Sequence, residues 1–262
     1  MTRNPDCTVL VCSCDKYADL HAPFLALFRK FWPDCPFETV LVTETVSGAD
    51  GFGRVVKCGP GKPWCQMLAE ALETVATPFV LLLMDDYLLS APVENTRFLR
   101  RLDEAKRFDV ASLRLMPNPP GKTPWRATGL LEMPKNVAYC VTCQATIWSR
   151  DFLFGLARRN RSAWEFERRG SFMVGGEQRP LLVTPTREFP FIDAVHKGYW
   201  EKAGLAVCRE NGVAVDLARR GRPPFRVRLV EGLKALVFAI FPWALIVRVQ
   251  NALDLGAKER RG

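Results

Sequence analysis

Apolar and polar positions alternate along the first 115 residues in blocks that predict strands and helices in turn. Short apolar runs indicate buried strands, whereas apolar residues at helical spacing indicate helices. This alternation is typical of a doubly wound α/β sheet, in which ligands bind beyond the carboxyl ends of the strands. The predicted strands are 7–14, 38–44, 54–58, 78–89 and 109–115, and the predicted helices are 21–32, 64–76 and 94–108.

The second half of the chain is less regular. A proline-rich loop is expected over 116–138, then a strand over 139–149 and a helix over 150–160. Residues 162–171 read as the start of another helix, and 181–200 as mixed strand and loop. We therefore expect one α/β domain over most of the chain.

Charge separates the C-terminal part from the rest. Of the net charge of +9, residues 209–262 carry +6, from eleven Lys and Arg residues against five acidic ones. Within them, 235–247 is an uncharged apolar run, shorter than the ~20 residues of a spanning helix. Basic flanks around such a run are typical of a helix on an anionic membrane surface. We expect a domain over 1–208 and a basic amphipathic extension over 209–262, with membrane contact through 222–253; a buried helix pair or dimer contact is the alternative.

Two classes of site are disfavoured by composition. Positive charge is not interleaved with aromatic residues over the fold, so no nucleic-acid partner is expected. The nine cysteines are odd in number and irregularly spaced, and we see no signal-peptide pattern. Both features favour free thiols and a cytoplasmic location. We expect the protein to be peripheral at the inner face of the cell membrane. Cys140 and Cys143 form one CxxC pair without a second, so we expect buried structural thiols rather than a zinc ribbon.

The strongest chemical signal is LLLMDDY, where a buried strand runs into Asp85 and Asp86. Adjacent carboxylates repel each other unless a cation or hydrogen-bond donors compensate them. Mg²⁺ or Mn²⁺ is commonly held by one or two carboxylates together with substrate phosphates. The pair therefore predicts a metal and diphosphate site, and a solvated or capping acidic turn is the alternative.

The order of segments resembles a known enzyme family. CSCDKYADL, FWPDCPFETVLVTE, WCQMLAEAL, PFVLLLMDDYLL, QATIW and SAWEFE together resemble bacterial glycosyltransferases of the GT-A fold, over about residues 7–202. The resemblance implies a Rossmann-like nucleotide-sugar-binding sheet and a metal-dependent, hexosyltransferase-like activity. The usual motif is Asp-any-Asp, whereas this chain has Met84-Asp85-Asp86. By resemblance, Asp86 ligates the metal and Asp85 faces the ribose or sugar.

Residues after the first two strands complete the predicted donor site. Ser13, Asp15 and Tyr17 follow the first strand, and Glu44 ends the second. A carboxylate there can accept from a ribose hydroxyl or base N–H, and Tyr17 can stack on a base; a turn capped by Asp15 is the alternative. Lys62 in GPGKP is a further candidate for the diphosphate, although Pro63 rules out a Walker A loop.

The stretch Trp164-Glu165-Phe166-Glu167 predicts the acceptor side. An inverting transfer needs a base that takes the proton of the acceptor hydroxyl. Ser162 and Glu165 fit a capping box, whereas Glu167 shares a helix face with Trp164. We favour Glu167 as the base, with Glu165 as a close second; a charged helix start with Trp164 in the core is the alternative.

The two histidines are assigned different places. His21 begins an amphipathic helix and is expected at the surface. His196 and Lys197 lie in DAVHKGYWEK, and similar folds often return a basic or imidazole side chain from this region to the metal or diphosphate. We therefore expect His196 near the metal and Lys197 near the diphosphate. No Ser-His-Asp pattern is visible in the sequence.

These patterns favour a glycosyltransferase that moves a sugar from a nucleotide-sugar donor to an acceptor hydroxyl on a cell-surface or lipid-linked glycan. Inversion by single displacement is expected, and retention is the alternative. Two other classes stay open: a sugar-phosphate nucleotidyltransferase, which would release pyrophosphate, and a non-catalytic membrane-associated binding protein.

Overall fold

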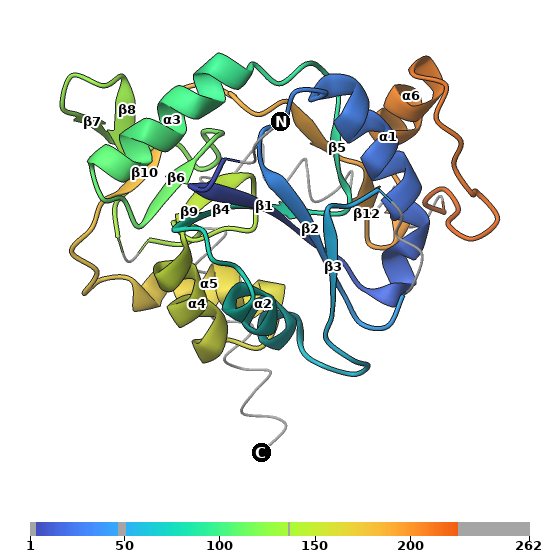
Figure 1. Cartoon of the computed structure of the whole chain (residues 1–262), viewed down its shortest axis with the longest axis horizontal. Coiled ribbons are helices and arrows are strands. Elements are labelled where there is room, and N and C mark those ends of the chain that lie inside the picture. The colour runs from blue at the N-terminus through green and yellow to red at the C-terminus, as the bar shows by residue number, and fades with distance from the viewer. Residues whose placement is uncertain (1–3, 47–50, 136, 225–262) are drawn as a thin grey trace.

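The computed structural model describes residues 4–46, 51–135 and 137–224, which form a central nine-stranded sheet with helices on both faces (Figure 1). The order of strands is β3-β2-β1-β4-β9-β6-β10-β8-β7. This architecture confirms the α/β class predicted from the alternation of elements. The strands are β1 (Cys7–Cys12), β2 (Glu38–Thr43), β3 (Arg54–Lys57), β4 (Phe79–Met84), β6 (Ser112–Arg114), β7 (Thr123–Trp125), β8 (Leu130–Glu132), β9 (Thr146–Ser149) and β10 (Leu181–Val183).

The first half of the sheet is parallel. Leu10 at the centre of β1 lies between Val40 of β2 and Leu82 of β4, both in parallel register. All six residues of β1 are buried, which explains why its sequence is a continuous apolar run rather than an alternating one. The strands β1, β2 and β4 therefore end at one side of the sheet, which we name the carboxyl edge.

The helices form two layers. In Figure 1, α1 (His21–Phe31), α3 (Asn95–Arg107) and α6 (Lys202–Glu210) lie on one side of the sheet, and α2 (Trp64–Glu73), α4 (Arg150–Arg159) and α5 (Ala163–Met173) lie on the other. Side chains of a strand alternate between faces, so Val9 packs in the first layer's core and Leu10 in the second's.

Strand β9 reverses direction inside the sheet. It runs antiparallel to both neighbours, and Ile147 lies opposite Leu81 of β4 and Leu113 of β6. The chain that enters β9 therefore arrives at the carboxyl edge. The strand predicted over 139–149 is only Thr146–Ser149, because backbone N–H groups earlier in the segment bond to side chains of α5: Val141 to Ser171 and Cys143 to Glu167.

The predicted strand 78–89 is also divided. β4 ends at Met84, a turn holds Asp85 and Asp86, and β5 (Tyr87–Leu89) leaves the sheet to pair antiparallel with β11 (Phe191–Asp193). The carbonyl of Asp86 accepts from the N–H groups of Leu88 and Ala194, at 3.1 and 2.9 Å. These bonds fix the turn at the carboxyl edge.

Shorter elements complete the edge. A 3₁₀-helix, η1 (Asp15–Leu20), links β1 to α1. β12 (Val195–His196) and β13 (Tyr199–Trp200) form a hairpin. Its two turn residues, Lys197 and Gly198, have φ values of 51° and 82°, the left-handed backbone that a tight hairpin turn requires and that glycine adopts without strain.

Several predictions about single residues and segments can be compared with the fold. All nine cysteines are free, and Cys140 and Cys143 are buried as expected. The surface position predicted for His21 is wrong: the side chain is 5% exposed, because the imidazole turns inward onto Ser13. No helix of the described chain has the length and apolarity needed to cross a bilayer. The membrane contact predicted for 222–253 falls, after residue 224, outside the described residues.

Candidate functional site

The turn after β4 places two carboxylates at the carboxyl edge, as the sequence predicts. Asp85 is 3% exposed and Asp86 is partly exposed. The N–H of Asp85 donates to the carbonyl of Cys12 at 3.1 Å, which ties the turn to the end of β1. Asp85 therefore faces the protein interior while Asp86 faces the edge.

A hydrogen-bonded chain supports Asp85. The hydroxyl of Ser13 donates to Oδ2 of Asp85, and Nε2 of His21 lies 2.7 Å from the same hydroxyl oxygen. Because Ser13 has one proton and gives it to Asp85, Nε2–H of His21 is the donor to Ser13. Burial, and then the neighbouring charge of Asp86, raise the pKa of Asp85 well above its usual range.

Asp86 sits among further charges. Burial raises the pKa of Asp86 to about 7, the nearby charge of Asp193 adds to this rise, and Arg220 opposes it. Asp193 ends β11 and lies opposite Tyr87 in the β5–β11 ladder. The pKa of Asp193 is also raised by partial desolvation of its carboxylate, although the residue is exposed, while Arg187 and His196 oppose the rise. Asp86 and Asp193 thus form an acidic pair that favours protons or a cation at neutral pH.

Tyr87 connects the acidic pair to the predicted acceptor side. Its ring stacks on Phe191 with centroids 4.4 Å apart. Burial raises the pKa of Tyr87, and the charges that raise it further include those of Asp86, Asp193 and Glu167. The charges of carboxylates from the β4–β5 turn, β11 and α5 therefore all act on one phenol.

The two glutamates of α5 differ in what they hold. Ser162 caps the helix by accepting from the N–H of Glu165 at 3.2 Å, and the carboxylate of Glu165 accepts from the N–H of Arg161 at 2.9 Å. Glu167 accepts instead from the N–H of Cys143 at 2.8 Å and the hydroxyl of Thr142 at 3.0 Å. The capping interpretation thus describes Glu165, and Glu167 faces the loop that enters β9.

Trp164 does not pack in the core. Its side chain is 71% exposed at the start of α5, so the alternative that placed Trp164 in the core is wrong. Trp64, in contrast, packs edge-on against Phe166 with ring centroids 5.6 Å apart.

The residues after β1 and β2 hold the two loops together. The carboxylate of Asp15 accepts from the N–H groups of Thr45 and Val46, at 2.9 and 3.1 Å, and from the hydroxyls of Thr43 and Thr45. These bonds, led by the Thr45 hydroxyl, lower the pKa of Asp15 to about 2. Glu44 accepts from the N–H of Asp15 at 3.0 Å. Both acidic side chains therefore join the loop after β1 to the loop after β2.

Arg220 is a residue that sequence reasoning missed. Its guanidinium lies 4.2 Å from the centroid of the Tyr17 ring, and it forms a two-point ion pair with Asp19 at 2.8 and 2.9 Å. It also donates to the carbonyls of Gly198 and Lys16. Since Arg220 is 5% exposed and opposes the raised pKa of Asp86, it provides a buried cation beside the acidic pair. It lies within the extension predicted to start at residue 209.

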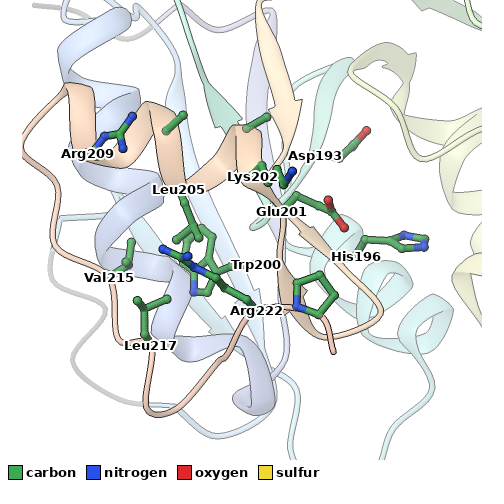
Figure 2. A pocket seen from close by; sticks show the side chains of 13 residues that line it. Asp193, His196, Trp200, Glu201, Lys202, Leu205, Arg209, Val215, Leu217 and Arg222 are labelled. Atoms are coloured by element: carbon green, nitrogen blue, oxygen red, sulfur yellow. The ribbon is translucent and has the colours of Figure 1, made fainter. Parts of the chain in front are cut away.

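The remaining predicted residues, Lys62, His196 and Lys197, have the following places in the structure. Lys62 pairs with Glu70 of α2 at 2.7 Å. His196 and Lys197 are exposed on the β12–β13 hairpin, and His196 lines a cavity together with Asp193 (Figure 2). Asp193 could have been found from its pattern, because FPFID repeats the apolar-run-then-Asp pattern of LLLMDD. Arg220 had no local signal, because its partner Asp19 lies 201 positions earlier in the sequence.

The donor atoms at the edge suit a hard cation. Asp86 and Asp193 offer oxygen ligands, which Mg²⁺ and Mn²⁺ prefer. Among the residues that the structure describes, no group of three or more His, Cys, Asp and Glu side chains is arranged to hold a metal ion. A metal here would therefore share its ligands with a bound molecule, as Mg²⁺ commonly does with phosphates.

Comparisons with known proteins give distant likenesses only. No protein-family model and no curated protein matches the chain. A cytidylyltransferase from Leptospira borgpetersenii is similar at 13% identity and a TM-score of 0.45, over 80% of this chain and 96% of that one. Glucosyl-3-phosphoglycerate synthase from Mycobacterium tuberculosis is similar at 11% identity and a TM-score of 0.44, over 85% and 82%.

A third solved structure is similar over a smaller part of its length. A fragment of TarS from S. aureus matches at 12% identity and a TM-score of 0.40, over 68% of this chain and 60% of that one. With TM-scores below 0.5, these likenesses do not assign the chain to any of the three groups.

Proposed function

We propose that the protein is a glycosyltransferase that moves a sugar from a nucleotide-sugar donor to an acceptor hydroxyl. The observation that supports this most is the grouping of Asp86 and Asp193 with Arg220 and Tyr17 at the carboxyl edge. Carboxylates that favour a cation, a guanidinium and an aromatic ring together suit a nucleoside diphosphate. Glu167 adds a carboxylate near the same group.

At the donor end, Asp86 and Asp193 would hold Mg²⁺ or Mn²⁺, with His196 beside them and Asp85 behind Asp86. When bound, the metal supplies positive charge that offsets the charge on a leaving diphosphate. Arg220 adds a fixed positive charge next to these carboxylates, and its stacking on Tyr17 keeps that ring in place for a base or ribose.

At the acceptor end, Glu167 would act as general base. Both of its hydrogen bonds to the β9 loop end on Oε1, which leaves Oε2 to take a proton. The acceptor oxygen attacks the anomeric carbon while its proton moves to Oε2. The bond from that carbon to the diphosphate breaks, and its electron pair leaves with the diphosphate. A single displacement of this kind inverts the anomeric configuration.

A donor screen by calorimetry tests the proposal. Nucleoside diphosphates and their sugars are titrated into the full chain with and without Mn²⁺. We expect at least one of them to bind, and to bind more tightly with the metal. If none of them binds in a metal-dependent way, the transferase proposal is wrong.

The products separate the remaining alternatives. A nucleotidyltransferase would consume a nucleoside triphosphate and release pyrophosphate, whereas a glycosyltransferase releases a nucleoside diphosphate. The loop Ser13–Tyr17 contains no glycine, unlike the glycine-rich loop usual in nucleotidyltransferases. A non-catalytic binding protein would give neither product and would tolerate Asp86→Asn.

For the acceptor, we propose a cell-surface or lipid-linked glycan, with the protein on the cytoplasmic side of the membrane. The support is the basic, apolar pattern of 222–253, which suits an anionic lipid surface. Flotation with vesicles tests it: the chain should float with vesicles that contain anionic lipid and stay behind with neutral ones. Equal flotation with both would overturn the electrostatic part.

A further inference from the structure

A large cavity lies next to the carboxyl edge. It has a volume of about 1130 Å³ and lies between α6 and the segment 213–223 that follows it (Figure 2). Asp193, His196 and Glu201 lie at one end of it, and Val215 and Leu217 at the other. Because Asp193 belongs to the acidic pair, the cavity adjoins the site proposed for catalysis.

The end away from Asp193 is apolar. Trp200, Leu205, Val215 and Leu217 line it, and Figure 2 shows these side chains gathered under α6. Leu217 is 43% exposed. Apolar walls around an open cavity indicate a ligand with an apolar part.

Cations border the same cavity. Lys202, Arg209 and Arg222 all line it and are exposed, and within the described chain no ion pair is formed by any of them. Lys202 also begins α6, whose first turn has no side-chain cap. The free N–H groups of a helix start add positive potential there. Figure 2 shows Lys202 at the Asp193 end of α6 and Arg209 at the other end, so positive charge is spread along the cavity and favours an anionic ligand group in it.

We propose that this cavity binds a lipid phosphate, namely the apolar chain and anionic group of a membrane-derived acceptor. The inference rests on the glycosyltransferase proposal and narrows its acceptor to an anionic amphiphile. The apolar chain of the lipid packs on Trp200 and Leu217. The phosphate of the lipid is held by Arg209, Arg222 and Lys202. The glycan end of the acceptor then extends past Asp193 toward Glu167.

Binding of dodecyl phosphate to the full chain, below its critical micelle concentration, tests this site by calorimetry. We expect dodecyl phosphate to bind, and inorganic phosphate and the neutral amphiphile dodecyl maltoside to bind at least about tenfold more weakly. The double variant Arg209→Gln/Arg222→Gln and the variant Leu217→Ser should each weaken dodecyl phosphate binding by about tenfold or more, because each removes one part of the recognition.

Matched variants keep the test decisive. Arg100 is an exposed arginine of α3 outside the cavity, so Arg100→Gln should bind as the unchanged protein does. If the double variant binds dodecyl phosphate as tightly as the unchanged protein, the amphiphile binds elsewhere and the proposal is wrong. If dodecyl maltoside binds as tightly as dodecyl phosphate, binding does not need the charge and the proposal is also wrong.

The two proposals fail separately. Nucleoside diphosphate binding with Mn²⁺ is measured on the same samples. If it persists while dodecyl phosphate does not bind, only the lipid site is wrong. If dodecyl phosphate binds at the cavity and no nucleotide binds, the glycosyltransferase proposal is wrong and the cavity remains a lipid-phosphate site.

Discussion

The hydroxyl of Ser13 donates a hydrogen bond to the buried carboxylate of Asp85. Behind it, His21 donates to Ser13 from α1. Three elements, β1, α1 and the β4–β5 turn, thus meet through one hydroxyl. Since Asp85 is the neighbour of Asp86, these hydrogen bonds fix where the carboxylate of Asp86 points.

Removing the Ser13 hydroxyl should cost stability. Ser13→Ala leaves Asp85 buried without its donor, which is expected to lower the free energy of unfolding by about 1–3 kcal/mol. Asp85→Asn should cost less, because the raised pKa of Asp85 already favours a neutral side chain that can accept from Ser13. Urea unfolding measures both. A larger loss from Asp85→Asn than from Ser13→Ala would contradict the neutral state of Asp85.

Asp86→Asn should remove metal-dependent turnover. The amide keeps the shape and loses the charge, so we expect kcat to fall by about 10²- to 10³-fold and Mn²⁺ to no longer strengthen nucleotide binding. Treatment of the unchanged protein with a chelator should have the same effect. Asp103→Asn, on the exposed face of α3, is the matched control and should leave turnover unchanged.

The metal-free protein should lose stability as pH rises toward neutrality. The folded-state pKa of Asp86, about 7, lies above its ordinary value of 3.8. Because the folded-state pKa is raised, the protonated Asp86 contributes its full stabilisation when the pH is below the ordinary pKa. This stabilisation is lost as the pH rises through the folded-state pKa. The melting temperature measured with chelator should therefore fall between about pH 4 and pH 7. The same measurement on Asp86→Asn gives the part of this fall that comes from other carboxylates. An equal fall in that variant would show that Asp86 is not responsible.

The two glutamates of α5 should separate activity from stability. Glu167→Gln keeps an acceptor at Oε1 for Thr142 and Cys143 and loses the base, so kcat should drop by about 10²- to 10⁴-fold with little change in melting temperature. Glu165→Ala removes a cap and should cost about 0.5–2 kcal/mol of stability without a matching loss of kcat. The opposite pattern in kinetics and melting would make Glu165 the base.

Arg220 should prove necessary for folding. Its side chain and that of Asp19 are 4% and 3% exposed, so Arg220→Gln leaves the buried carboxylate with only the longer ion pair to Arg219, at 3.7 Å. We expect a loss of about 3–5 kcal/mol in the free energy of unfolding. A chain that ends at residue 208 should be destabilised at least as much. If that shortened chain is as stable as the full one, the ion pair adds nothing and the boundary predicted at residue 208 stands as a domain boundary.

The parallel part of the fold could be predicted because each strand is buried on both faces, and such a strand is recognised in the sequence as an apolar run. Val9, Leu10 and Val11 have the same character although they face different layers. The break after Met84 could not be predicted, because the apolar run resumes at Tyr87 and the pairing of β5 with β11 joins segments about 100 residues apart. Tertiary pairing, rather than local preference, ends that strand.

The candidate site shows the same division. Asp85, Asp86 and Glu167 could be singled out because local pattern places them at the end of a strand and near the start of a helix. The inward turn of His21 could not, because its periodicity matches a surface position and only the hydroxyl of Ser13, eight residues earlier, turns it inward. Arg220 depends on a partner at the other end of the chain, which no window of sequence contains.

The ion pair between Arg220 and Asp19 spans 201 positions of the chain. During synthesis, strands β1 to β4 can meet while the ribosome is still making the second half of the protein, but the loop beside Tyr17 gains its cation only when residue 220 has emerged. A growing chain therefore displays an incomplete edge for most of its translation, and competence to bind ligand arrives as one of the last events in its biogenesis.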